Sequence, residues 1–570
     1  MAESERIENL EQLREIFGES DDDDSETREP DFSGFDSDLD FEGIPEPDSD
    51  ESTEESDENS SNSSEDGEDE TWSDQLTNIT CSTFEGISGI RVPIPQPVRE
   101  VDFFNLMFGE EEFRILVEES NRFARQTLKD NPRRLTQWKD TTVEEMKAFI
   151  GIWILMGLNS LPSIANYWSK DPFLRNEGIQ QVMTKNRFEE LAQFIHFNDS
   201  EKRPARGARN YDRLYKVRPI LSGVLNNIQN AYYPGKNISI DELGGMVAFR
   251  GRVSFLQYMP AKPTKYGIKC WMAADSGNAY VVNFSVYLGR EDQAPRIHGL
   301  GYDVIMKMAR PYLNKFHHLF FDNFFSSTRL VEHLQLQNTY ACATVRPNRK
   351  DLPVCAKNKL KQPGELVVQQ KGTVLYTKWH DKRDVNFIST NVSPFEQHRM
   401  VERKVKGQQI DITKPYVSDL YTAKMGGVDR ADQLRSSYTV GRQCKKWYRY
   451  LFWYALNLSI CNALVLQCVN EQKQEKRQFK FRLALGKQLI GGFTQRKRNL
   501  LRATPVLNAQ TPQHVSVRCE RRKKECVQCK KATRKTAKGR PIETRFKCEQ
   551  CDVALCKVVC FAQFHNMDRS

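Results

Sequence analysis

The spacing of apolar and polar residues divides the chain into a helical region and a region rich in strands. From about residue 98 to 235 the spacing is mostly helical, and EEFRILVEESNRFARQTL, residues 111–128, is the clearest amphipathic helix. The run AFIGIWILMGL, residues 148–158, follows Thr142 and Glu145, whose spacing is that of a capping box and predicts the start of a buried helix. Its 11 residues are too few to span a bilayer, so no membrane partner is expected.

Further along the chain, β-rich runs alternate with helical spacing. The predicted strands are YGIKCWMAAD, NAYVVNFSVYLG, HHLFFD and TYACATV, separated by turns or by the helical segments DVIMKMARPYLN and STRLVEHLQLQ. Strands that alternate with helices form a sheet covered by crossover helices. The pattern therefore predicts a mixed sheet in this region.

Two of the predicted strands end in an aspartate. Asp275 precedes a Ser-Gly turn, and Asp322 ends HHLFFD. If the two strands are neighbours, we expect their carboxylates to converge at one edge of the sheet, where their repulsion favours binding of Mg²⁺ or Mn²⁺. The alternative is that each aspartate forms a turn at the end of a buried strand.

A third acidic position follows a pair of glycines in AKMGGVDRADQLRSSY. A helix that begins near Val428 would place Asp429 and Asp432 three residues apart on one face. Such carboxylates could complete a two-metal site for phosphoryl transfer. The alternative is an acid in the first turn of a helix, where it interacts favourably with the helix dipole.

An ordered series of motifs resembles a known family. The series is ISIDE, FRGR, KPTKYGIK, ADSG, FDNFFSS, TVRPNRK, MGGVDRADQ and KKWYRYLFWYALNLSICNA. Over residues 98–570 it closely resembles the piggyBac transposases and their domesticated relatives. The resemblance implies three catalytic aspartates that bind Mg²⁺ or Mn²⁺, matched here by Asp275, Asp322 and Asp429, with Asp432 as a possible additional acid. Because LGGMVA after IDE is about two residues longer than the family pattern, no role is expected for Asp241 or Glu242.

The resemblance also implies a multidomain α+β fold, in which a β-rich insertion splits an RNase H-like catalytic core. The expected parts are an acidic arm (1–75), a helical dimerisation and DNA-binding domain (98–258 and 441–505), the catalytic domain (259–345 and 418–440), the insertion (346–417) and a zinc domain (519–570). The implied activity is cut-and-paste transposition through hairpin ends at TTAA targets, performed by a homodimer on double-stranded DNA. The alternative is a domesticated DNA-binding protein without cleavage activity.

The charge distribution agrees with a polyanionic partner. The net charge is +7, but residues 1–70 hold 30 acidic and 3 basic residues, which leaves 46 acidic and 80 basic residues and a net charge of +34 for the remainder. The acidic arm has too little apolar content to fold on its own, and two interpretations of it stay open. It is either a solubilising tail or an autoinhibitory arm that competes with DNA.

Two basic segments are candidate DNA contacts. Arg346, Arg349 and Lys350 follow the strand TYACATV, and their alternative is a solvated surface cluster. In the second segment, Lys445 and Lys446 precede Trp447, which could stack on an unpaired base. The aromatic run after Trp447 is more typical of a helix core.

The C-terminal cysteines predict zinc binding. Pairs of CxxC spacing, followed by a further cysteine pair and a histidine, suit tetrahedral zinc in an intracellular protein. The predicted ligands are Cys526, Cys529, Cys548, Cys551, Cys556, Cys560 and His565. Two zinc ions need eight ligands, so either Cys519 or His514 completes the set or one ion is incompletely liganded by the protein. The basic runs RRKK and QRKR predict import into the nucleus.

Overall fold

The computed structural model describes residues 71–567, with gaps at 131–137, 243–245, 261, 263–264, 290–296, 406–407, 443, 474–476, 496–513, 520–522, 550 and 558. The predicted acidic arm up to residue 70 lies outside these residues, as do most of QRKR and the first half of RRKK. The chain divides into two compact units, residues 1–496 and 497–570, and each is described by itself.

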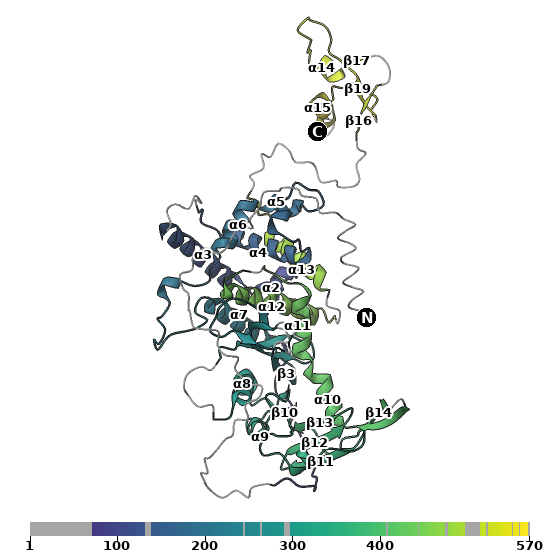
Figure 1. Cartoon of the computed structure of the whole chain (residues 1–570). Helices are drawn as coiled ribbons and strands as arrows, with labels where there is room; N and C mark the ends of the chain where they lie inside the picture. Colours follow the sequence, from purple (N-terminus) through teal and green to yellow (C-terminus); the bar gives the residue numbers. More distant parts are fainter. Residues whose placement is uncertain are drawn as a thin grey trace, which may run out of the picture. The chain divides into compact units, whose positions relative to one another are not determined.

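The first unit contains a mixed sheet, several strands of which are labelled in Figure 1. Among the described residues it contains eight strands. In spatial order they are β11 (Leu366–Lys371), β12 (Val374–His380), β13 (Asp384–Ser389), β10 (Tyr340–Thr344), β9 (His318–Phe321), β3 (Asn237–Glu242), β7 (Cys270–Asp275) and β8 (Val281–Val286). The predicted mixed sheet is therefore present.

Strand direction decides which ends of the strands meet. β9 is parallel to both of its neighbours, β10 and β3. β7 is antiparallel to β3, and β8 is antiparallel to β7. The C-terminal end of β7 therefore lies at one end of the strands of the sheet, and the C-terminal ends of β3 and β9 lie at the other.

Two features of the sheet differ from the predicted division of the chain. The central strand β3 comes from the segment assigned to the helical domain, so the sheet does not begin at residue 259. Strands β11 to β13 of the predicted insertion continue the same sheet, because β13 pairs with β10. The hairpin of β14 (Arg399–Val405) and β15 (Gln408–Lys414) forms a separate two-stranded sheet. The outer strand β11 is met at Gln370 by the backbone of Ser73, with two hydrogen bonds of 2.9 Å.

Helices cover both faces of the sheet. The predicted crossover helices are α8 (Leu300–Ala309) and α9 (Thr328–Leu336), and Leu319 and Phe321 of β9 share a core cluster with them. On the opposite face Phe320 packs with Val417 of α10 (Tyr416–Met425). α11 (Gly427–Ser437) packs on β3 and β7. All four residues of β9 are buried, and a continuous apolar run of this kind is what a strand covered on both faces requires.

Helices from both ends of the first unit pack together. They are α2 (Glu100–Asn105), α3 (Glu110–Asp130), α4 (Val143–Leu158), α5 (Glu177–Val182), α6 (Lys185–Phe194), α7 (Arg218–Ala231), α12 (Trp447–Asn470) and α13 (Gln478–Ile490). α13 packs on α4, and α12 packs on α2 and α7. The Thr142 side chain accepts a hydrogen bond from the Glu145 N–H at 3.3 Å, as the predicted cap of α4 requires.

α12 is the one helix of the described residues that is long and apolar enough to cross a membrane. However, 89% of its most apolar window is buried inside the protein. A core helix passes the same test of length and composition, so this helix gives no reason to expect a membrane span.

Three short strands that lie between β3 and β7 in the sequence form a separate small sheet. They are β4 (Val247–Ala248), β5 (Gln257–Tyr258) and β6 (Tyr266–Ile268), with β6 in the centre. A further pair joins β1 (Gly89–Ile90) to β2 (Tyr232–Tyr233). Short 3₁₀ helices lie at Ile164–Trp168, Ser200–Lys202, Arg310–Tyr312 and Val354–Lys357.

The second unit has very little apolar core. Its elements are β16 (Ser516–Arg518), β17 (Lys524–Glu525), α14 (Val527–Lys531), β18 (Glu543–Thr544), β19 (Phe546–Cys548) and α15 (Val559–Met567). Among its described residues, four of the five buried residues that form its core are cysteines, and Leu555 is the fifth. A unit of this size cannot be stable on such a core alone, so it needs cross-links or metal.

Candidate functional site

Asp275 does not lie beside Asp322, so the predicted convergence of these two carboxylates is wrong. Asp275 pairs with Ile238 near the beginning of β3. Its carboxylate accepts hydrogen bonds from the Tyr232 hydroxyl at 2.9 Å and from the Gly235 and Gly277 N–H groups, both at 2.7 Å. The physical reason is the antiparallel direction of β7. Asp275 joins two turns at the opposite edge of the sheet.

Asp241 occupies the place that was expected for Asp275. In the parallel pairing of β3 and β9, Ser239 lies opposite Phe320. Two residues further along both strands, Asp241 and Asp322 therefore come to the same face of the sheet. Adjacent strands are about 4.8 Å apart, whereas Asp275 is displaced by three residues, or about 10 Å, along β3. Asp241 and Asp322 are thus the neighbouring carboxylates.

α11 brings Asp429 to the same face. Its second residue, Val428, donates a backbone hydrogen bond to the Ser239 hydroxyl at 3.1 Å. A Cβ atom on Gly427 would lie only 2.3 Å from that hydroxyl oxygen, so glycine is what permits the close approach. Because Ser239 and Asp241 are two residues apart on β3, the helix begins on the face that carries Asp241.

The electrostatics of these carboxylates reflect their proximity. Burial and then the negative charge of Asp322 raise the pKa of Asp241 to about 7. The charges of Glu242 and Asp429 act in the same direction. Burial also raises the pKa of Asp322. Buried acids that repel one another disfavour the fully ionised state, and a divalent cation would relieve that cost.

Two lysines hold the glutamate that follows Asp241. Lys262 Nζ lies 2.7 Å from Glu242 Oε1, and Lys269 Nζ lies 3.0 Å from Glu242 Oε2. Burial acts to raise the pKa of Glu242, but these ammonium groups outweigh it and hold the pKa below its ordinary value. Lys269 is enclosed by aromatic rings, with Trp271 at 4.3 Å. Glu242 is therefore an anion with its own counterions.

Asp432 has a separate partner. Its Oδ1 accepts hydrogen bonds from Arg435 Nε at 3.0 Å and Nη2 at 2.6 Å. Asp432 lies one turn after Asp429 on α11, as predicted from the spacing. Its carboxylate is paired within its own helix.

The first basic segment contacts the loop that follows β9. Arg346 Nε donates to Asn323 Oδ1 at 3.2 Å, and Arg349 Nη2 donates to the Phe324 carbonyl at 2.7 Å. Lys350 is exposed. The structure thus brings two of the three predicted cations to the carboxylate cluster.

The second basic segment is partly engaged in packing. Lys445 is exposed, whereas the ammonium of Lys446 lies 5.0 Å from the ring centre of Phe123. Trp447 packs edge-to-face on Phe255 at 5.3 Å. Only part of the Trp447 surface is therefore accessible.

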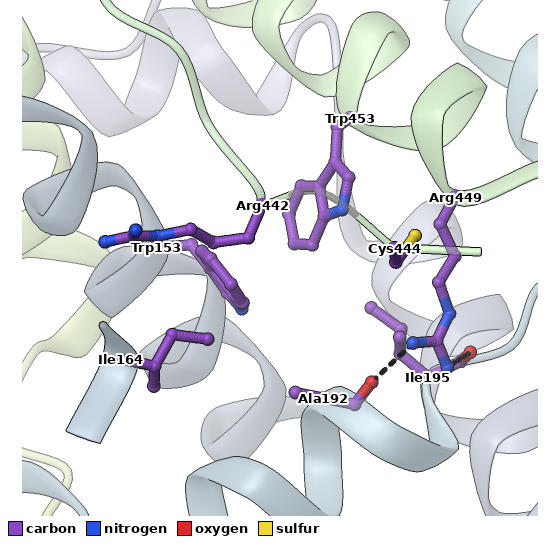
Figure 2. A pocket seen from close by; sticks show the side chains of 8 residues that line it. All are labelled: Trp153, Ile164, Ala192, Ile195, Arg442, Cys444, Arg449 and Trp453. Carbon is purple, nitrogen blue, oxygen red and sulfur yellow. Dashed lines mark hydrogen bonds between the residues drawn. The ribbon is translucent and has the colours of Figure 1, made fainter. Parts of the chain in front are cut away.

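The nearby Arg449 is buried and has a structural role. Its guanidinium donates to the carbonyls of Ala192 and Gln193 at 2.8 and 2.6 Å, at the end of α6. It borders a cavity of about 40 Å³, also lined by Trp153 and Trp453 (Figure 2). That volume holds a few water molecules at most, and the cavity contains none of the predicted site residues.

The second unit assembles two sets of metal-ligand side chains. The first set is Cys526, Cys529, Cys556 and Cys560, and the second is His514, Cys548, Cys551 and His565. All ligand atoms within a set lie within 4.8 Å of one another. His514 is thus the eighth ligand candidate, and Cys519 belongs to neither set of the described residues.

The distances suit tetrahedral zinc. Zn–S bonds of about 2.3 Å place two sulfurs about 3.8 Å apart, and Cys529 Sγ lies 3.9 Å from Cys556 Sγ and 3.4 Å from Cys560 Sγ. In the other set His565 Nε2 lies 3.6 Å from Cys551 Sγ. His565 Nδ1 lies 2.7 Å from the Phe561 carbonyl, the second contact that orients a ligating imidazole. The donor sets therefore fit one zinc ion each.

Sequence motifs pointed to part of this arrangement. Asp322 and Asp429 were identified from strand and helix positions, whereas Asp241 was missed. The available signal was ISIDE, a β-rich run that carries its aspartate near its carboxyl end. The two extra residues of the following loop do not displace this aspartate, because it lies inside β3.

Comparison with known families assigns the class. Residues 99–464 match a family model described as Transposase IS4. Residues 509–566 match a model described as DDE_Tnp_1-like zinc finger. The first match covers more than half of the chain, so the protein is a member of a class of DNA transposases and related proteins.

The relatives define the family within this class. PiggyBac transposable element-derived protein 5 of Homo sapiens is 24% identical over 423 residues, which cover 71% of this chain and 78% of that protein. PiggyBac transposable element-derived protein 2 of Homo sapiens is 28% identical over 386 residues, 65% of this chain and 61% of that protein. A cryo-EM structure of the piggyBac transposase synaptic complex with hairpin DNA has the same fold, with a TM-score of 0.61, 24% identity and coverage of 83% of this chain and 98% of that one. The chain belongs to the piggyBac family.

Proposed function

We propose that this protein is a metal-dependent DNA transposase whose catalytic carboxylates are Asp241, Asp322 and Asp429. The observation that carries the proposal is the strand register, in which Asp241 comes opposite Asp322 while α11 begins on the same face. The raised pKa of Asp241, to which the charges of both other aspartates contribute, agrees with this cluster. Strongly perturbed acids in such a cluster are typical of catalytic sites. Asp241 replaces Asp275 in this assignment, because Asp275 has three hydrogen-bond donors of its own at the opposite edge.

The residue chemistry suits hard divalent cations. Carboxylate oxygens are the preferred ligands of Mg²⁺ and Mn²⁺, and such ions supply charge neutralisation and an activated water for phosphodiester cleavage. Asp241 and Asp322 would hold them from adjacent strands, and Asp429 from the first turn of α11. Lys262 and Lys269 keep Glu242 ionised beside this cluster.

The proposed catalytic core is RNase H-like. The order β8-β7-β3-β9-β10, with β7 antiparallel to its neighbours, supports this proposal. In our proposal the core binds double-stranded DNA through the net positive charge of the body, and Arg346 and Arg349 contact phosphates beside Asp322.

By analogy with the family, we propose cut-and-paste transposition through hairpin ends at TTAA targets by a nuclear homodimer. Family membership supports only the coarse activity, DNA transposition, and the finer steps belong to the proposal. The steps require positioned phosphates and neutralised charge rather than a covalent protein intermediate, which agrees with a site built from carboxylates.

The zinc unit is proposed to bind the transposon ends. Zinc at the two ligand sets would supply the folding free energy that its small core lacks. Many of its cations are exposed and suited to phosphate contacts. They are Lys523, Lys524, Lys530, Lys531, Arg534, Lys535, Lys538 and Arg540.

A second candidate function is sequence-specific DNA binding without cleavage. The human relatives are named as proteins derived from transposable elements, which favours this candidate. The presence of all three carboxylates in one cluster favours the enzyme.

An excision assay separates the two functions. A plasmid that carries a reporter between matching transposon ends is cotransfected with the wild-type gene or with Asp241→Asn. We expect excision only with the wild-type protein. If the wild-type protein binds the ends but never releases the reporter, with Mg²⁺ or Mn²⁺ in vitro as well, the proposed enzymatic function is wrong and the binding function remains.

A further inference from the structure

The small sheet β4-β6-β5 lies next to the proposed catalytic carboxylates. The chain enters it directly after β3, which ends at Glu242, and leaves it directly into β7. Trp271 in β7 pairs with Glu242, so both connections meet at the edge of the main sheet that carries Asp241. Lys262, between β5 and β6, contacts Glu242 through its ammonium. The small sheet is thus attached to the carboxylate cluster at both of its ends and by this ion pair.

Two tyrosines of this sheet form an exposed aromatic pair. Tyr258 of β5 and Tyr266 of β6 are direct cross-strand partners. Their ring centres are 4.7 Å apart with an interplanar angle of 35°. The two residues remain 42% and 46% exposed. Large aromatic side chains in this position present ring faces and edges to solvent.

Two exposed cations belong to the segment that forms the small sheet. Arg250 follows β4, and Lys265 directly precedes Tyr266; both are exposed. The small sheet also packs on the helical region, where Phe249 contacts Tyr450 at 5.2 Å and Phe255 contacts Trp447. The small sheet is therefore held in place by packing, while its two tyrosines stay partly exposed in a segment that also carries exposed cations.

We propose that Tyr258 and Tyr266 form a stacking platform for unpaired bases of the DNA strand that reaches the carboxylate cluster. Aromatic rings interleaved with cations bind single-stranded DNA, because every base has a face that can stack while the backbone is held by charge. A fully paired duplex hides those faces. The platform thus selects DNA that is locally unpaired next to the cleavage site, which deepens the proposed function and rests on it.

A purely structural role for the pair makes a different prediction. A cross-strand aromatic pair stabilises a hairpin by packing alone, and its removal would then affect all DNA substrates alike. Replacement by phenylalanine preserves a ring that can both pack and stack. The discriminating property is therefore preference for unpaired over paired DNA, measured on variants that keep their fold.

The test measures binding of the full-length zinc-loaded protein to a 20-nucleotide oligo-dT strand and to the oligo-dT·oligo-dA duplex, in EDTA-free buffer without Mg²⁺. The variants are Tyr258→Ala, Tyr266→Ala, the two Phe replacements and, as a control at a distant exposed ring, Phe173→Ala, whose ring is 94% exposed. A second probe carries 2-aminopurine within the oligo-dT strand, because stacking on tyrosine quenches its fluorescence. Thermal unfolding checks that each variant folds.

We expect each alanine variant to bind the single strand about 5- to 150-fold more weakly, the range for loss of one stacked base, and to lose the 2-aminopurine quenching. Duplex affinity, the Phe variants and Phe173→Ala should stay within about twofold of wild type. Equal losses of affinity for the single strand and for the duplex, or unchanged affinity for the single strand, would refute the proposed stacking platform. This binding assay needs no cleavage. The stacking platform can therefore be refuted while the wild-type protein still excises the reporter, and it can be supported when excision fails.

Discussion

Exchange of Asp241 and Asp275 for asparagine, one at a time, tests which aspartate belongs to the proposed active site. Both changes replace a carboxyl group of the main sheet by an amide and keep the side-chain volume. We expect Asp241→Asn to reduce metal-dependent strand cleavage by at least about 100-fold. Mutation of a residue that only hydrogen-bonds to a metal ligand already reduces metal affinity or activity by about 10- to 100-fold. We expect Asp275→Asn to cleave whenever it is folded.

The effects on stability should be opposite in sign. In wild type, Asp275 Oδ1 accepts from the Gly277 N–H, and Oδ2 accepts from the Tyr232 hydroxyl and the Gly235 N–H. In Asp275→Asn an amide NH₂ group replaces one of these oxygens and cannot accept a hydrogen bond. At least one buried donor therefore loses its acceptor. Such a loss costs about 1–3 kcal/mol. The free energy of unfolding of Asp275→Asn should therefore be lower than that of wild type by about this amount.

Asp241→Asn should instead stabilise the metal-free protein. The pKa of Asp241 is about 7 in the folded state and about 3.9 in the unfolded state, so the folded protein binds more protons between these values. Stability is then lost as the pH rises from about 4 to about 7, by up to about 4 kcal/mol. Asparagine removes this loss, so the gain over wild type should be largest at pH 8 and small at pH 4.

The assay combines two measurements on purified protein. Denaturant unfolding in EDTA at pH 5 and pH 8 gives the free energies, and cleavage of end-containing DNA with Mg²⁺ gives the rates at a temperature where both variants are folded. A folded Asp275→Asn protein that cannot cleave, together with an Asp241→Asn protein that can, would refute the assignment. Equal pH dependence of stability in Asp241→Asn and wild type would refute the electrostatic argument.

Other predictions use different parts of the structure. Native mass spectrometry should find two zinc ions per chain in wild type and in Cys519→Ser, but fewer in His514→Ala; loss of a zinc ion from Cys519→Ser would contradict the ligand sets. Gly427→Ala should reduce cleavage because its Cβ collides with Ser239, and Ser239→Ala should partly restore it; additive effects in this double-mutant cycle would argue against the contact. Cleavage at limiting Mg²⁺ should fall about tenfold per pH unit below 7 as Asp241 becomes protonated, and a flat profile down to pH 5 would exclude that step.

The sequence was sufficient to predict the elements but not their directions. The runs that became β7, β8 and β9 and the helices α8 and α9 were identified from periodicity. Their mutual directions depend on pairing between distant segments, which a single run does not encode. A signal was nonetheless available, since a short turn joins β7 to β8 and a helix joins β8 to β9. A hairpin followed by a helical crossover makes β7 antiparallel to β9, so Asp275 and Asp322 must end at opposite edges.

The zinc ligands illustrate a similar limit. Spacing identified the cysteines and His565, but could not decide between Cys519 and His514. The two sets alternate along the chain, so that the second set contributes residues before, between and after those of the first. Partners in such an arrangement are determined by the three-dimensional path of the loops and not by distance in the sequence. The eighth ligand could therefore be identified only from the three-dimensional structure.

The pairing of β13 with β10 has a consequence for how this chain can vary in length. β10 would otherwise be an edge strand with unpaired backbone groups, and such edges recruit strands from other molecules and promote aggregation. Deletion of the whole insertion would therefore cost solubility before it altered any chemistry. The hairpin β14–β15 is not paired with the sheet, so gains and losses of sequence are best tolerated there. A shortened form of the protein should be trimmed at residues 399–414 and keep β11 to β13 intact.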